Sequence, residues 1–130
     1  NSFFIFIPRS KKLEPIKTNF YVDLNDLLEI SYQKDVVLKN TKNFLKNKSS
    51  NNILLWGAKG MGKSTLVKCV VDYCNKEFNE DLKMLELLNN NIEHLIDIVY
   101  QLSKYKYKFI IFIDDISFKD NDDNFNLLKT

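Results

Sequence analysis

The stretch Gly57-Ala58-Lys59-Gly60-Met61-Gly62-Lys63-Ser64 fits the phosphate-loop pattern G-x-x-x-x-G-K-[ST] at every position. It contains all three glycines of the 130-residue chain. Glycine lets a backbone turn sharply and brings its N–H groups close to phosphate oxygens. A chance match is expected in roughly one chain in a thousand of this composition. The stretch therefore predicts a loop that binds the phosphates of a nucleotide.

The residues of this loop have distinct expected roles. Lys63 supplies a mobile cation for the β- and γ-phosphates and is the candidate for stabilising charge during catalysis. Ser64 offers a hydroxyl group to Mg²⁺, and Thr65 is a further candidate phosphate contact. The backbone of the loop is expected to contact phosphate along Gly57, Ala58, Lys59, Gly60, Met61 and Gly62.

The flanking residues predict a strand before the loop and a helix after it. Ile53–Trp56 is a short apolar run of the kind that forms a buried strand. After the loop, apolar residues recur at helical spacing at Leu66, Val70, Tyr73, Cys74 and Phe78. A helix in this position directs its positive N-terminal end at the phosphates. The context is therefore the one that a phosphate loop requires.

A second motif lies further along the chain. Phe109–Ile113 consists of five apolar residues, typical of a strand buried on both faces, and it leads into Asp114 and Asp115. Asp114 is the candidate Mg²⁺ ligand, acting through water because Mg²⁺ keeps much of its hydration shell. Asp115 is the candidate to orient or deprotonate the attacking water. The alternative is that these acids only begin a turn.

The rest of the chain alternates between helical and strand patterns. The expected elements are a helix at Gln33–Lys46, a strand at Leu82–Leu88, a helix at 92–103 and a final helix beginning after Asp120–Asn124. Alternation of this kind predicts a parallel sheet covered by helices on both faces, a three-layer α/β/α fold. Residues 1–20, which include both prolines, are expected to form an irregular lead-in to a domain spanning 21–130.

Composition excludes several classes of protein. No apolar run approaches the roughly 18 residues of a membrane span. Cys69 and Cys74 lack metal-ligand spacing, so we interpret them as packing residues of a cytoplasmic protein. The net charge of +2 gives no clear nucleic-acid signal. Lys104–Lys108 alternates lysine with tyrosine, and we interpret it as a cationic helix end, with nucleic-acid contact as the alternative.

The residues around both motifs resemble an uncharacterised bacterial family of AAA+-type ATP-binding proteins. The resemblance is carried by Asn51–Gly57, which leads into the loop, by Asp114–Phe118 and by the lead-in Leu24–Ile30. It covers about residues 20–130 and implies ATP rather than GTP as the ligand. The residues themselves disfavour a GTPase, because the chain has no N-K-x-D motif and no D-x-x-G after its acidic strand.

The resemblance also implies a place for the adenine base. In AAA+ proteins the segment before the first strand flanks the base, which would place Leu28 and Ile30 beside it. Glu29 stands where glycine is expected, which is a departure from the pattern.

Parts that AAA+ domains carry cannot be assigned in this chain. They are a sensor strand between the phosphate-loop strand and the acidic strand, an arginine finger acting across subunits and a helical lid. We therefore expect the N-terminal part of a longer ATPase, incomplete at its C-terminus, whose missing parts would form a homo-oligomer.

The leading expectation is hydrolysis of ATP to ADP and phosphate by the full-length protein, with this fragment inactive alone. One alternative is a nucleotide-binding switch or scaffold that hardly turns over. Another is a P-loop small-molecule kinase, which the paired Asp114 and Asp115 on a long buried strand disfavour.

Overall fold

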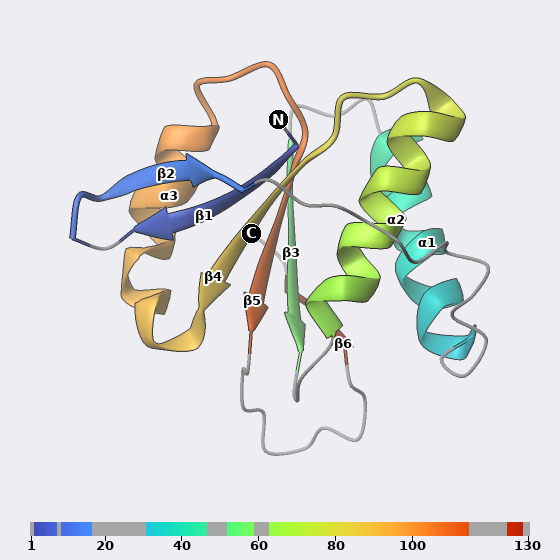
Figure 1. Cartoon of the computed structure of the whole chain (residues 1–130), viewed down its shortest axis with the longest axis horizontal. Helices are drawn as coiled ribbons and strands as arrows, with labels where there is room; N and C mark the ends of the chain where they lie inside the picture. Colours follow the sequence, from blue (N-terminus) through green and yellow to red (C-terminus); the bar gives the residue numbers. More distant parts are fainter. Residues whose placement is uncertain are drawn as a thin grey trace.

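A six-stranded sheet in the order β2-β1-β4-β5-β3-β6 forms the centre of the computed structural model (Figure 1). The structure describes residues 2–7, 9–16, 31–46, 52–58, 63–114 and 125–128. Its elements are β1 (Phe3–Ile7), β2 (Lys12–Pro15), α1 (Ser31–Lys46), β3 (Ile53–Ala58), α2 (Lys63–Phe78), β4 (Lys83–Leu88), the 3₁₀ helix η3 (Asn89–His94), α3 (Leu95–Leu102), β5 (Phe109–Asp114) and β6 (Phe125–Leu128). Strands β1, β4, β5 and β3 are parallel, while β2 and β6 pair antiparallel at the two edges.

Strand β5 lies in the middle of the sheet, between β4 and β3. Its five apolar residues are all buried. Leu55 and Leu85 both pair with Ile111, which shows that the three strands run in register. A strand with neighbours on both sides and helices on both faces is shielded from water, and its sequence is therefore an uninterrupted apolar run.

The helices cover the two faces of the sheet as two separate layers. Ile110 and Phe112 of β5 pack into the core beneath α1 and α2, whereas Ile111 and Ile113 pack into the core beneath α3. This alternation follows from the two-residue period of a strand. The fold is therefore α/β with a mostly parallel sheet and helices on both sides, as the sequence pattern predicts.

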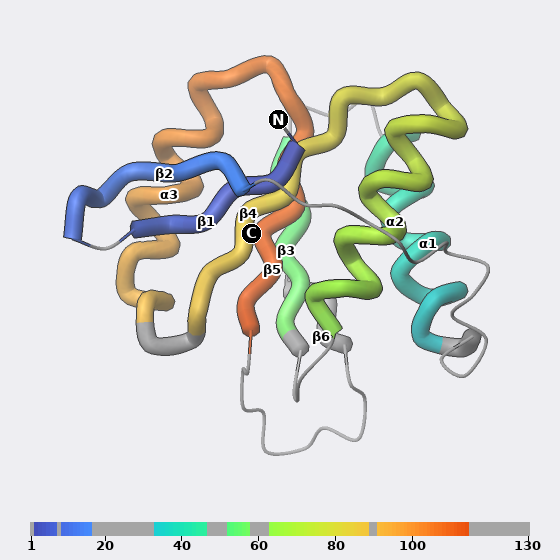
Figure 2. Tube along the Cα trace, viewed as in Figure 1, coloured from blue at the N-terminus to red at the C-terminus, as the bar shows by residue number. Residues whose placement is uncertain are grey.

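Helices α1 and α2 lie side by side and run in the same direction (Figure 2). Near their starts Lys63 Nζ donates a hydrogen bond to Gln33 Oε1 over 3.3 Å. Near their ends Lys42 Nζ lies 5.7 Å from the centroid of the Phe78 ring. The N-termini of both helices therefore point to the same end of the sheet, the end at which the parallel strands finish.

Side-chain hydrogen bonds link the helices α1 and α2 to the sheet at its opposite end, where β4 and β5 begin. Lys108 Nζ, just before β5, donates to the Phe44 carbonyl in the last turn of α1 over 2.7 Å. Burial lowers the pKa of Lys108, and the nearby Glu80 carboxylate opposes that shift. Asn75 links α2 to β4, because its amide donates to the Leu82 carbonyl and accepts from the Leu82 N–H. These bonds fix how β4 and β5 enter the sheet.

The structure corrects the prediction for the two ends of the chain. Residues 1–20 contain the hairpin β1–β2 rather than an irregular lead-in, and β1 pairs parallel with β4. Pro15 fits because it ends an edge strand, where a missing N–H breaks no ladder. The final helix is also wrong, because Phe125–Leu128 forms β6 against the free edge of β3. Both pairings join segments distant in sequence, which local patterns do not report.

The other predicted elements are confirmed. Helices α1 and α2 and strands β3, β4 and β5 all lie where the periodicity places them. The helix expected at 92–103 is divided into η3 and α3. No helix among the described residues is both long and apolar enough to cross a membrane.

Candidate functional site

Strands β3 and β5 end together beside the start of α2. Trp56 pairs with Phe112 and Gly57 with Ile113, so Asp114 lies next to the point at which β3 leads into the glycine-rich loop. On the other side of β5, Asp114 pairs with Leu88 at the end of β4. The predicted strand before the glycine-rich sequence and the predicted helix after it are confirmed, since β3 ends at Ala58 and α2 begins at Lys63.

Asp114 lies on the face of the sheet that α2 covers. Side chains alternate along β5, and the two of matching parity, Ile110 and Phe112, pack beneath α1 and α2. Asp114 follows them on the same face and is half-buried. The carboxylate therefore lies at the strand ends on the side from which α2 starts.

Lys63 is the first residue of α2, and its ammonium group bonds to α1. Gln33, in the first turn of α1, accepts this bond through its side-chain oxygen. Both side chains are half-buried. The sequence analysis missed Gln33, because no spacing along the chain links it to the loop and only the packing of α1 against α2 brings the two together.

A half-buried ion pair lies beneath the same part of α2. Lys68 Nζ contacts the Glu86 carboxylate of β4, and each side chain is 18% exposed. Glu86 pairs with Phe112, two residues before the Leu88–Asp114 pair, on the same face of the sheet. The sequence analysis missed this pair too. Its only signal was a lone acid within the apolar strand Lys83–Leu88.

The predicted site residues divide into two groups. The structure brings Gly57, Ala58, Lys63, Ser64, Thr65 and Asp114 to one end of the sheet. Within the first turn of α2, Ser64 is half-buried and Thr65 is exposed. The remaining predicted residues lie outside the described part of the chain, namely Leu28, Ile30, Lys59, Gly60, Met61, Gly62 and Asp115. Their roles stay predictions.

Two side chains at this end of the sheet are candidate metal ligands by their residue type. Among the residues that the structure describes, no three His, Cys, Asp or Glu side chains gather into a metal-binding group. Mg²⁺ seldom needs such a group, because it takes one or two carboxylates together with water and phosphate oxygens. Asp114 and Ser64 carry oxygen atoms of the type that Mg²⁺ prefers.

Fold and site define an α/β protein with a mostly parallel sheet and a cluster of charged and hydroxyl groups where its strands end. The chain belongs to the family described as "Protein of unknown function (DUF815)", whose model matches residues 1–130. No curated protein and no solved structure matches the chain. What the site binds is therefore inferred from its own residues.

Proposed function

We propose that this protein binds ATP together with Mg²⁺ at the end of the sheet where β3 and β5 finish. We propose further that the full-length protein hydrolyses ATP to ADP and phosphate. One observation carries the proposal: Asp114 ends the strand next to the one that leads into the phosphate-loop sequence, on the face from which α2 starts. A nucleotide–Mg²⁺ complex needs a carboxylate in that relation to its phosphates.

The groups that would meet the phosphates carry positive charge. Helix α2 has 16 residues, and its N-terminus contributes a partial positive charge and backbone N–H groups that can donate to an anion. Lys63 adds a full charge at the same point. Its partner Gln33 is a neutral acceptor, and a phosphate oxygen forms the stronger, charge-assisted bond. Phosphate is therefore expected to displace Gln33 from the ammonium group.

The Mg²⁺ ion would be held by the Ser64 hydroxyl and by Asp114, directly or through water. The ion would offset the charge of the phosphates when bound. Asp115 is proposed as the residue that orients or deprotonates the attacking water, and its support is the sequence pattern alone.

The assignment to AAA+ ATPases has a different basis. It rests on the sequence resemblance around the loop and around Asp114–Phe118. In the described strands β5 pairs directly with β3, whereas AAA+ domains have a sensor strand between the corresponding two. Nucleotide binding is proposed whether or not the protein is an AAA+ ATPase, because it depends only on the strand ends, the loop and α2.

ATP titration of Lys63→Ala tests the proposal. Loss of a charged hydrogen-bonding partner is expected to weaken ATP·Mg²⁺ binding by about tenfold or more, measured calorimetrically. Lys39→Ala is the matched control, because Lys39 is an exposed lysine on α1. Thermal unfolding of both variants shows whether the fold is retained. Equal ATP affinity in Lys63→Ala and the parent contradicts the proposal.

Turnover is tested separately by phosphate release from the full-length protein. We expect release that Asp115→Asn abolishes while ATP binding persists. Tight binding without release would instead identify a nucleotide-dependent switch.

A further inference from the structure

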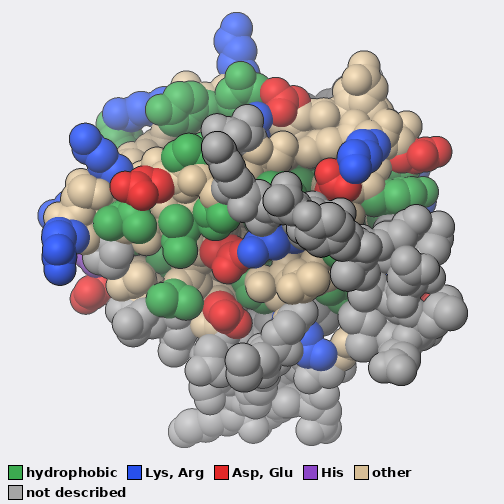
Figure 3. Space-filling model, viewed as in Figure 1, with side chains coloured by type: hydrophobic (Ala, Val, Ile, Leu, Met, Phe, Trp, Pro, Cys, Tyr) green, Lys and Arg blue, Asp and Glu red, His purple; other side chains and the backbone are tan. Residues whose placement is uncertain are grey.

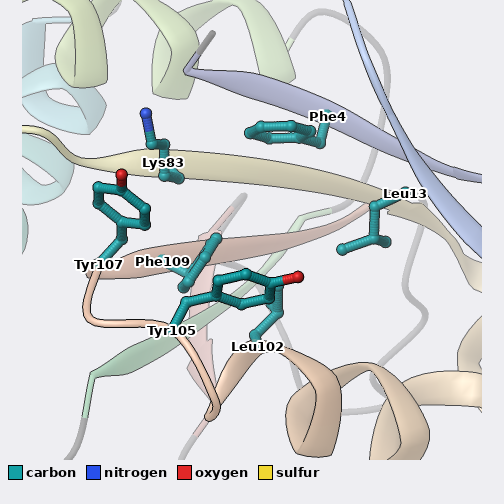
Figure 4. A pocket seen from close by; sticks show the side chains of 7 residues that line it. All are labelled: Phe4, Leu13, Lys83, Leu102, Tyr105, Tyr107 and Phe109. Atoms are coloured by element: carbon teal, nitrogen blue, oxygen red, sulfur yellow. The ribbon is translucent and has the colours of Figure 1, made fainter.

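A pocket of about 230 Å³ lies at the opposite end of the sheet, where the parallel strands begin (Figure 4). It is lined by Phe4, Leu13, Lys83, Leu102, Tyr105, Tyr107 and Phe109. These residues come from the hairpin β1–β2, from the starts of β4 and β5, and from the end of α3 with the segment that follows it. None of them belongs to the proposed nucleotide site.

Two exposed tyrosine rings form one wall of this pocket. Tyr105 is 57% exposed and Tyr107 is 43% exposed. Both rings pack against the buried Phe109, with centroid separations of 6.4 and 6.5 Å and tilted, edge-on geometry. Phe109 thus fixes their orientation while leaving much of each ring in solvent. Fixed, exposed aromatic rings are platforms on which another flat ring can stack.

Two lysine side chains lie over tyrosine rings in this part of the molecule, one of them over the pocket residue Tyr107. Lys83 Nζ lies 4.8 Å from the centroid of Tyr107, and Lys104 Nζ lies 4.5 Å from that of Tyr100. Lys83 is paired with Asp81, whereas the segment 103–108 contains three lysines and no acid. In the space-filling view, lysine and hydrophobic side chains neighbour one another along the upper left of the molecule (Figure 3).

The structure separates two roles within Lys104–Lys108. Lys108 bonds to a carbonyl in the last turn of α1, on the other side of the sheet from the pocket. This contact places a positive charge at the C-terminal end of α1, whereas the sequence pattern was interpreted as the cationic end of the helix at 92–103. Lys104 and Lys106 are exposed in the segment that carries the two pocket tyrosines. The alternating pattern therefore supplies both a structural contact and a surface of rings and positive charges.

We propose that this aromatic–lysine surface, formed by Tyr105, Tyr107, Lys104 and Lys106, binds single-stranded nucleic acid. The bases stack on the two tyrosine rings, and the lysines face the phosphates. The exposed Lys104 and Lys106 favour an anionic partner, and the two exposed rings favour one that carries planar groups. A single strand offers both, because every nucleotide pairs one flat base with one negative charge.

Fluorescence anisotropy with a labelled 12-nucleotide oligothymidine and the whole chain tests this proposal. Tyr105→Ala and Tyr107→Ala are each expected to weaken binding by about 5- to 100-fold, since stacking on one ring contributes that much per base. Tyr105→Phe is the matched control, because it keeps the ring, and it should bind like the parent. Lys104→Ala and Lys106→Ala should each lower the slope of log affinity against log salt concentration by about 0.7.

Four outcomes overturn the proposal. The first is no oligothymidine binding at 50 mM salt, and the second is equal binding by the parent and Tyr105→Ala. The third is binding of an acidic, tyrosine-containing peptide where oligothymidine fails, which would assign the surface to a protein partner. The fourth is loss of oligothymidine binding in Lys63→Ala, which would place the strand at the phosphate loop. Unchanged oligothymidine binding by Lys63→Ala supports a site separate from the phosphate loop, whether or not the variant loses affinity for ATP.

Discussion

The two halves of α2 lie on the same face of the sheet but use their charged side chains differently. In the first half, Lys63 bonds to Gln33 of α1 and Lys68 pairs with Glu86 of β4. In the second half, Lys76 pairs with Asp72 of the same helix, and the lysine side chain is 76% exposed. Charges thus reach inward at the start of the helix and stay on its surface towards the end.

This difference has an energetic meaning. The surface pair of the second half contributes little, because exposed ion pairs typically stabilise by less than about 1 kcal/mol. The second half is fixed by packing, with Val71 and Cys74 fully buried, and the first half packs as well, through Leu66, Val67 and Val70. The first half holds two ammonium groups in half-buried positions, which costs desolvation energy that packing alone would not require. The proposed nucleotide site would use the first of these two ammonium groups, that of Lys63.

The largest expected effect follows from changing the carboxylate that faces the first half of α2. Asp114→Asn should weaken the Mg²⁺-dependent part of ATP binding by roughly 10- to 100-fold, because the amide is a poor ligand for Mg²⁺. Thermal stability should change little, since Asp114 is only half-buried. The measurement is an ATP titration with and without Mg²⁺, and Asp97→Asn on the exposed side of α3 is the control. An unaltered Mg²⁺ dependence would remove Asp114 from the site.

The second half of α2 should respond to pH through its stability and not through binding. Burial raises the pKa of the Cys74 thiol to about 11, with Lys42 lowering it and Glu80 raising it by charge. In the unfolded chain a thiol ionises near 8.5, so the folded state binds the proton more tightly. The resulting stability is complete below about pH 8.5 and is lost as the pH rises towards 11.

Urea unfolding at pH 8 and pH 10.5 measures this effect. Between the two, the parent should lose about 2 kcal/mol more than Cys74→Ala, which lacks the titrating group. The variant controls for tyrosines and lysines that titrate in the same range, and its ATP affinity at pH 8 should equal that of the parent. Parallel pH profiles for the two proteins would contradict a buried neutral thiol.

The sequence patterns predicted correctly those strands and helices that depend on residues close together in the chain. The apolar run before the loop, the glycines and the helical stripe placed β3 and α2 correctly, and the run Phe109–Ile113 placed β5. Lys63 and Asp114 lie at one end of the sheet because parallel strands share a carboxyl edge. Sequence patterns could not reveal Gln33, because its partner lies 30 residues away on another helix.

The same limit explains the errors at the chain ends. The two prolines indicated an irregular start, but the pairing of β1 with β4 depends on a strand far along the chain. The polar cluster before Phe125 resembled a helix cap, yet the outer edge of β3 offers backbone hydrogen bonds to Phe125–Leu128. Long-range strand pairing decided both ends, and no local period encodes it.

The smallest expected effect concerns the neutral partner of Lys63. Gln33→Ala removes a bond that phosphate must otherwise break, so ATP affinity should rise by about two- to tenfold. Gln33→Glu should act in the opposite direction, because a carboxylate holds the ammonium group more strongly and repels the phosphates. The two variants measured in one ATP titration therefore bracket the parent. If both variants weaken ATP binding equally, Gln33 orients Lys63 towards the nucleotide instead of holding it away. The contact with α1 then prepares the first half of α2 for binding, and the Lys63–Gln33 bond need not break.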